Sequence, residues 1–135
     1  MERWRQGETG FPLIDAAMRS LKSSGWLHPA LRSLTAEFLC GILHQPSEHG
    51  IAWFAAQQTD FDPALNEGNW QTAARNARRR SIDIIQTARR LDPDGTFVRR
   101  HIPELAHLPV NLVHTPWLAS SEIDAHGYPP PVVAP

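Results

Sequence analysis

The sequence predicts an all-α fold with one hydrophobic core, and three observations lead to it. Residues 11–25 place apolar side chains at helical spacing between Pro12, which suits a first helical turn, and Gly25, which suits a helix end. No segment shows the alternation of apolar and polar residues that marks a strand. The 135 residues, 41% hydrophobic and 20% charged, are about the size of one folded domain.

Further helices follow along the chain. The apolar residues of 29–44 cover more than half of the helix circumference, which predicts a central and largely buried helix. A third helix is expected over 47–58, and two short helices are expected over 70–92. The last helix, within 96–105, must stop near Pro103, because proline disfavours helical backbone in the residue before it.

The helices occupy residues 1–118, and residues 119–135 form a Pro-rich tail that we expect to be extended, wrapping or disordered. The single cysteine, Cys40, excludes a disulfide framework. No apolar run approaches the ~20 residues that a membrane helix needs, and residues 1–10 lack the pattern of a signal peptide. A cytoplasmic protein without membrane contact is therefore expected.

The formal net charge of -1 argues against a generally basic nucleic-acid-binding surface, so any DNA contact needs a local patch. The candidate patch is the run RNARRR, which contains Arg75, Arg78, Arg79 and Arg80. Four guanidinium groups in six residues could neutralise phosphates, or could simply form a solvated helix face.

Two other kinds of site find no support in the residues. The seven histidines show no HxxxH spacing and no CxxC occurs, so no metal site is expected. Neither a GxSxG nucleophile turn nor a Gly-rich phosphate loop is present. A hydrolase and a phosphate cradle are therefore not predicted.

The most unusual stretch is an acid-rich segment, TDFDPALNEGNWQ, at residues 59–71. Asp60 and Asp62 follow a predicted helix end, where the helix dipole disfavours negative charge, so a cation is expected nearby. Arg32 is the natural partner, because it sits on an otherwise apolar helix and an unpaired guanidinium is costly to bury. The alternative is that all three are surface charges.

The second half of the acid-rich segment is also expected to be non-helical. Asn66, Gly68 and Asn69 predict a turn whose polar groups could serve a ligand or only the backbone. Trp70 follows directly, and its ring could be a core ring, a stacking platform or a redox relay. For a single tryptophan, the core is the better interpretation.

Several separate motifs also agree with one known family. They are WRQGETGFPLIDAAMRSLKSSGWLHPALRSLTAEFL, DFDPALNEGNWQ, LDPDGTFVRRHIPEL and YPPPVV. In this order and spacing they resemble the C-terminal part of the FAD-binding helical domain of the DNA photolyase and cryptochrome family. The resemblance implies a multi-helix orthogonal bundle with FAD as cofactor. It also implies light-driven flavin electron transfer linked to DNA repair or blue-light sensing.

The resemblance assigns roles to residues of the acid-rich segment. It implies that Arg32 pairs with Asp60 beside the isoalloxazine ring and that Asp62 lines the flavin. It places Asn66 opposite flavin N5, where an amide can influence the favoured redox and protonation states. It makes Trp70 the electron donor nearest the flavin.

The same resemblance places Trp26 and His28 in the segment that approaches the cofactor and the lesion cavity. The chain also departs from the family pattern. Where repair enzymes of the family have residues that contact the lesion, this chain has Pro29, Ala30 and Ser33. In addition, Thr72 replaces a tryptophan that would stack on damaged bases, and Ser47 stands where the middle tryptophan of the electron chain is expected. Whether the chain is a carbon-carbon lyase is left open by these departures.

The antenna domain and the part of the helical domain that holds the FAD phosphates and adenine are absent from this sequence. The chain is therefore expected to provide one wall of the flavin site and to expose apolar surface. Pairing with itself or with another chain would cover that surface. The alternative is a truncated helical interaction module that has lost FAD binding.

Overall fold

The computed structural model describes residues 1–59, 63–79, 83–119 and 127–134, and all regular structure in these ranges is helical, which confirms the all-α prediction. The α-helices are α1 (Glu2–Gln6), α2 (Pro12–Ser24), α3 (Pro29–Glu37), α4 (Ser47–Gln57), α5 (Pro63–Arg79), α6 (Ile84–Leu91) and α7 (Thr96–His101). One π-helical turn spans Phe38–Ile42, and short 3₁₀ turns span Pro103–Leu105 and Pro116–Leu118. No helix in the described part of the chain is long and apolar enough to cross a membrane.

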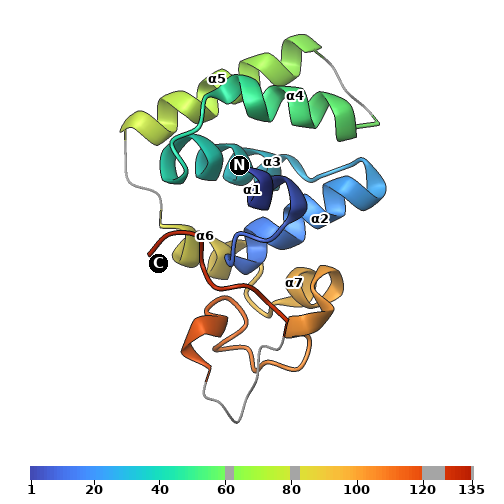
Figure 1. The fold of residues 1–135 in the computed structure, drawn as a ribbon, viewed down its shortest axis with the longest axis vertical. Helices are drawn as coiled ribbons and strands as arrows, with labels where there is room; N and C mark the ends of the chain where they lie inside the picture. The colour runs from blue at the N-terminus through green and yellow to red at the C-terminus, as the bar shows by residue number, and fades with distance from the viewer. Residues whose placement is uncertain (60–62, 80–82, 120–126, 135) are drawn as a thin grey trace.

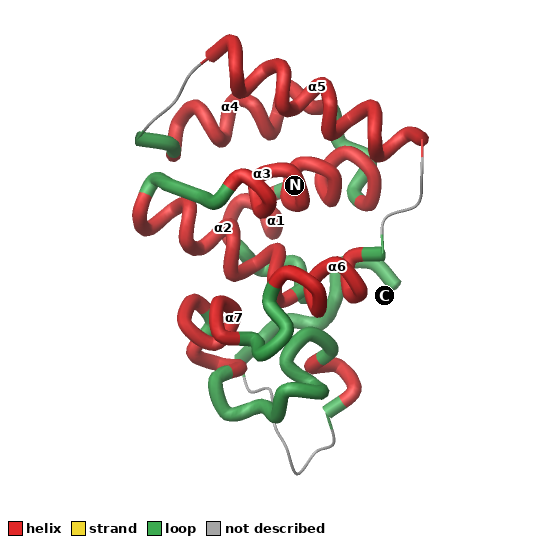
Figure 2. Tube along the Cα trace, turned by 180° about the vertical axis from the view of Figure 1, so that it is seen from behind, coloured by secondary structure: helices red, strands yellow, loops and turns green. Residues whose placement is uncertain are grey.

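The helices stack in successive layers (Figure 1). Helices α4 and α5 lie side by side at one end, α3 lies beneath them, α1 and α2 follow, and α6 and α7 lie toward the other end. The view from behind shows the same order (Figure 2). Since α3 packs against both α5 and α2, it connects the layers, as expected for a central helix.

Local signals account for the bounds of α2 and α7. Helix α2 has Pro12 as its first residue and Ser24 as its last, and it is capped by Gly25, whose φ of 74° is left-handed and therefore suits glycine. Helix α7 ends at His101, two residues before Pro103, as the proline predicts. These two predictions are confirmed.

The buried helix predicted over 29–44 is present but changes form. Its first part is α3, and from Phe38 onward the backbone widens into the π-helical turn. Leu34, Phe38 and Leu39 are buried, whereas Leu43 is only partly buried. The periodicity therefore identified the core-facing side but not the change of helix type.

Helix α1 is an element that the sequence pattern did not predict. It has five residues, and its C-cap is Gly7, which has a left-handed φ of 68°. Its central residue, Trp4, is fully buried. A helix this short has too few turns to show a periodic apolar stripe in the sequence. Its buried indole ring can therefore be recognised only in the folded structure.

The buried carboxylate of Asp15 connects the start of α2 to the residues just before it and to the C-terminal segment. The Asp15 side chain accepts hydrogen bonds from Thr9 N at 2.8 Å, Thr9 Oγ1 at 2.6 Å and Gly10 N at 2.9 Å. It also accepts a hydrogen bond from the Tyr128 hydroxyl. Burial raises the pKa of Asp15, although these hydrogen bonds oppose the shift.

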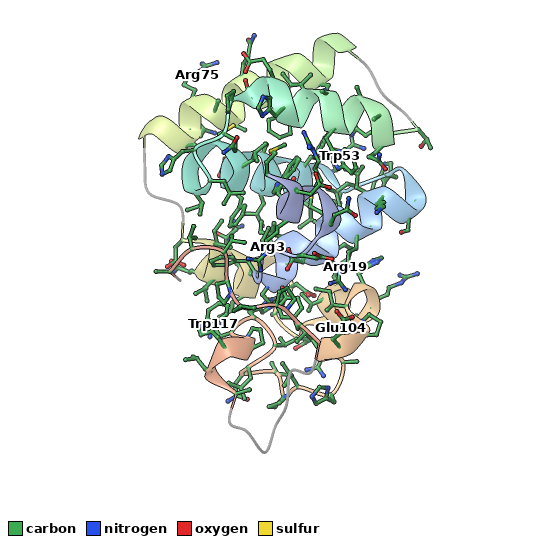
Figure 3. All side chains as sticks on the ribbon, in the orientation of Figure 1. Arg3, Arg19, Trp53, Arg75, Glu104 and Trp117 are labelled. Atoms are coloured by element: carbon green, nitrogen blue, oxygen red, sulfur yellow. The ribbon has the colours of Figure 1, made fainter. Side chains whose placement is uncertain are left out.

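The C-terminal segment runs back along the N-terminal part of the chain. Val132 N donates to Thr9 O at 2.8 Å, and Arg3, which is labelled in Figure 3, donates to Pro130 O at 2.9 Å. A Cβ atom on Gly10, whose φ is 85°, would lie 2.4 Å from Pro130 O, so glycine permits this close approach. Residues 127–134 thus pack as a wrapping tail, while the boundary between residues 118 and 119 stays a prediction.

Tyr128 predicts a loss of stability in alkaline solution. Burial first, and then the negative charge of Asp15, raise its pKa well above the ordinary value of 10.0. Between pH 10.0 and the folded pKa, the unfolded chain binds fewer protons than the folded chain, so the free energy of unfolding falls as pH rises. Tyr128→Phe should remove this decline and lower the free energy of unfolding near neutral pH by about 1–3 kcal/mol.

Urea unfolding at a series of pH values measures both effects. An equally steep decline in Tyr128→Phe would show that other groups cause it.

Candidate functional site

The first part of the candidate site lies between the end of α2 and the start of α3. The Trp26 ring is 49% exposed, and the Arg32 guanidinium carbon lies 6.0 Å from its centroid. The His28 ring meets Trp26 edge-on at 6.4 Å. Arg32 Nε donates to the Leu27 carbonyl, which holds the guanidinium near this turn. The structure therefore brings together three residues that the sequence analysis assigned to the cofactor side.

His28 also has a local structural role. Its Nδ1 accepts the backbone N–H of Ala30 at 3.1 Å, so the imidazole caps the first turn of α3. Pro29 is the first residue of that helix, where its missing N–H costs nothing. The predicted cofactor-side segment is thus held by ordinary helix-capping chemistry.

The start of the acid-rich segment lies beside this turn. Thr59 donates to the Gly25 carbonyl through its backbone N–H at 2.9 Å and through its hydroxyl at 3.3 Å. The chain leaving α4 is therefore fixed next to Trp26. Asp60 and Asp62 lie outside the described residues, so the pairing of Arg32 with Asp60 stays a prediction.

The turn predicted at Asn66, Gly68 and Asn69 is wrong, because all three lie inside α5. Asn66, Trp70 and Ala73 are buried, and their spacing places them on one side of a helix. Gly68 and Asn69 are exposed on the other side. Burial of that side overrides the weak helix propensity of asparagine and glycine.

Asn66 combines burial with an unsatisfied donor. The residue is 8% exposed, and its Nδ2 has no hydrogen-bond partner within the described ranges. A buried amide donor left in this state costs about 1–3 kcal/mol, so native proteins keep few of them. Such an atom fits a site that receives an acceptor from a bound group.

Trp70 lies one helical turn beyond Asn66 and is only 2% exposed. Its ring meets Phe54 at 5.2 Å and Trp4 at 6.1 Å, both in edge-to-face geometry. A Cβ atom on Gly50 would lie 2.0 Å from the Trp70 ring, so α4 needs glycine there. The ring is therefore part of the core and is held in one orientation.

The basic run is described only in part. Arg75 is exposed and projects away from the body of the molecule (Figure 3). Arg78 and Arg79 belong to the last turn of α5, and Arg80 lies outside the described residues. Whether the four arginines form one nucleic-acid contact stays a prediction.

Two residues of this region were missed by the sequence analysis. Trp4 contacts Trp70 from a helix that no periodic pattern revealed. Gly50 admits the Trp70 ring from α4. An isolated glycine inside a predicted helix is a signal for close packing, and this signal could have identified Gly50.

Comparison with known proteins identifies the family. The family described as FAD binding domain of DNA photolyase matches residues 1–135. Cryptochrome-1 of Anopheles gambiae is 43% identical over 147 residues, which cover 98% of this chain and 27% of that protein. The deoxyribodipyrimidine photo-lyase of Escherichia coli K12 is 37% identical over 139 residues, which cover 98% of this chain and 29% of that protein.

A solved structure shares the fold. The archaeal photolyase from Sulfolobus tokodaii, whose crystal structure contains two FAD molecules, has a TM-score of 0.89 and 34% identity, covering 98% of this chain and 31% of that chain. The chain thus spans between 27% and 31% of the length of these relatives. Sequence and fold agree, and the chain belongs to the DNA photolyase and cryptochrome family, where it corresponds to part of the FAD-binding domain.

Proposed function

We propose that this chain supplies part of the flavin-facing wall of a photolyase- or cryptochrome-type FAD site and takes part in light-driven electron transfer. The buried Nδ2 of Asn66, which has no hydrogen-bond partner among the described residues, carries this proposal. Its free N–H donor suits a flavin ring nitrogen, which is a hydrogen-bond acceptor. Trp70, one turn along the same helix, is the proposed electron donor.

The residues of the turn before α3 complete the proposed wall. Arg32 is held against Trp26 and Leu27, and its positive charge suits the two acids proposed beside the flavin, Asp60 and Asp62. The exposed Trp26 ring offers an apolar surface for a planar group. When bound, a flavin absorbs blue light and exchanges electrons, which is the chemistry that this chain's residues would tune.

DNA is proposed as a partner of the basic run. Arg75 is exposed at the end of the molecule, and Arg78, Arg79 and Arg80 follow it. In contrast, Thr72 is exposed, carries no ring that could stack on a base, and donates its hydroxyl to its own helix at 3.0 Å. We therefore propose phosphate contact and electron transfer, without base stacking at position 72.

A second candidate function is a helical interaction module that holds no cofactor. The observation behind it is the exposure of three large apolar side chains on the described surface, which a partner chain could cover. They are Trp26, Val110 and Leu118. This alternative predicts an oligomer or heteromer without bound flavin.

Asn66→Leu separates the two functions, because it has opposite effects on folding and on binding. Leucine has a similar volume and leaves no buried donor unsatisfied, so the cofactor-free chain should be more stable by about 1–3 kcal/mol. FAD affinity should fall by roughly tenfold to a hundredfold, because the hydrogen bond to the flavin is lost. Urea unfolding and titration of FAD fluorescence measure the two quantities.

Asn69→Leu is the matched control, since Asn69 lies on the same helix but is exposed. It should leave FAD affinity unchanged. If the unmodified chain binds no FAD, the proposal is wrong and the interaction module is favoured. If Asn66→Leu binds FAD as tightly as the unmodified chain, Asn66 is not a ligand.

A further inference from the structure

A small pocket lies at the opposite end of the molecule from α4 and α5. It has a volume of about 230 Å³ and is formed by the 3₁₀ turn Pro116–Leu118 together with the C-terminal segment. Its lining residues are Pro116, Trp117, Tyr128, Pro129, Pro130 and Pro131. Figure 3 shows Trp117 far from Trp53 and Arg75, which belong to α4 and α5. The pocket is therefore separate from the proposed flavin site.

Both aromatic walls of the pocket are held in place by contacts behind them. The Tyr128 hydroxyl donates to the Asp15 carboxylate, which fixes the orientation of the tyrosine ring. The Trp117 ring meets the buried Phe11 ring edge-on at 5.8 Å. The other walls are proline residues, whose backbone is restricted by the ring. A ligand therefore meets a preformed surface, and little ordering opposes its binding.

The wall contributed by the C-terminal segment is anchored outside the pocket. Arg3 donates to the Pro130 carbonyl at 2.9 Å, and Val132 N donates to the Thr9 carbonyl at 2.8 Å. The opposite wall, at Trp117, is anchored by its own contact with Phe11. Both sides of the pocket are thus fixed by the surrounding fold.

The chemistry of the lining selects an uncharged ligand. None of the lining residues in the described part of the chain carries a charged side chain, so a buried ion would lose its hydration without gaining a partner. Four of the six are prolines, which have no backbone N–H, and the Tyr128 hydroxyl already donates to Asp15. The polar groups that prolines offer are carbonyl oxygens, which favour a ligand with an N–H or O–H donor.

The size and the walls of the pocket select a small aromatic ring. Since an apolar cavity of about 150 Å³ can bind benzene, a pocket of about 230 Å³ has room for one or two fused rings. Sites for drug-sized ligands usually measure roughly 300 Å³ or more, so a larger compound does not fit. Proline and aromatic rings pack well against each other, as they do where aromatic grooves bind Pro-rich peptides.

We propose that this pocket binds a small, neutral, free aromatic compound that carries an N–H or O–H donor, of the indole or phenol class. The ring packs against Trp117 and the prolines, and the donor reaches a proline carbonyl. Because the compound contacts the 3₁₀ turn and residues 128–131 together, it fastens the C-terminal segment to the rest of the molecule. Its binding therefore stabilises the folded chain.

Titration of the cofactor-free chain with indole, followed by NMR, tests this site. A compound of this size is expected to bind with a dissociation constant of ~1 mM or lower and to shift the indole N–H resonance of Trp117. Trp117→Leu should weaken binding about tenfold or more, because the stacking surface is lost. Trp53→Phe is the matched control, which removes an indole at the other end of the molecule and should keep the affinity.

Equal affinity of the unmodified chain and Trp117→Leu would place the indole elsewhere and overturn the proposal. If Trp117→Leu folds poorly, magnetisation transfer from bound indole to Tyr128 and Pro131 locates the ligand in the unmodified chain. Absence of this transfer at saturating indole also overturns the site.

Tyr128→Phe tests the link between the ligand and the C-terminal segment. Phenylalanine keeps the ring that lines the pocket but loses the hydrogen bond to Asp15. Indole affinity should fall several-fold, because the segment is in place for a smaller fraction of the time. In the unmodified chain, saturating indole should slow hydrogen exchange of the Val132 N–H several-fold. If affinity and exchange are both unchanged, the ligand does not fasten the segment.

Three further compounds test the ligand class. Benzofuran has the shape of indole without the N–H donor and should bind several-fold more weakly. Benzoate should show no measurable binding, because its charge finds no partner in the pocket. N-acetyltryptophanamide carries the same ring on a peptide backbone and should bind no more tightly than indole. Tighter binding of benzofuran or benzoate than of indole would overturn the assigned class, and tighter binding of the amide would assign the pocket to a side chain of a partner protein instead.

Discussion

Replacing Asp15 by alanine is expected to lower the free energy of unfolding by about 2–4 kcal/mol. The substitution leaves the backbone N–H groups of Thr9 and Gly10 without their buried acceptor, and it removes the partner of the Tyr128 hydroxyl. Relief of the buried negative charge offsets part of this cost, because burial already disfavours the ionised carboxylate. Urea unfolding near neutral pH measures the change.

Asp15→Asn is the control that separates hydrogen bonding from charge. Its side-chain oxygen can still accept from Thr9, whereas its NH₂ group would face the N–H of Gly10. We expect this variant to lower the free energy of unfolding less than alanine does. We also expect release of the C-terminal segment, which faster proteolysis after residue 119 would detect. Equal stability of the alanine variant and the unmodified chain would contradict a stabilising network.

Replacing Gly50 by alanine is expected to lower the free energy of unfolding by about 1–3 kcal/mol. The added methyl would lie 2.0 Å, 2.4 Å and 2.6 Å from three atoms of the Trp70 ring. The ring cannot move freely, because Phe54 and Trp4 hold its other contacts. Chemical denaturation measures the loss, and near-ultraviolet circular dichroism should report a displaced indole.

Gly68→Ala is the matched control, since it makes the same change in a helix where no atom lies within 4 Å. Alanine there should raise the free energy of unfolding by roughly 0.5–1 kcal/mol, because glycine is a poor helix former. If both substitutions change the free energy of unfolding alike, the close approach of Gly50 to Trp70 does not affect stability.

The acid-rich segment shows where local inference fails. Asn66, Gly68 and Asn69 have turn propensity, and a turn was the reasonable prediction. The segment is nevertheless helical, because a helix, unlike a strand, buries Asn66, Trp70 and Ala73 on the same side. In contrast, Trp26, His28 and Arg32 lie within seven residues, so one helix start brings them together.

The sequence by itself determined the helical class, the bounds of α2, the end of α7 and the family. These features depend on proline, glycine and apolar spacing within a few residues, or on motifs that can be compared directly. Resemblance also directed attention to Asn66 and Trp70. The unsatisfied donor of Asn66 could be recognised only when its surroundings were known.

Only the tertiary structure decided which distant residues meet. Tyr128 reaches Asp15 across 113 positions, and Trp4 reaches Thr35 across 31. The spacing of apolar residues indicates which side of a helix is buried, but it does not indicate which residues cover that side. The contact of Trp4 with Trp70 arises because all the helices must fill one core together, and this shared packing is not a property of any single segment.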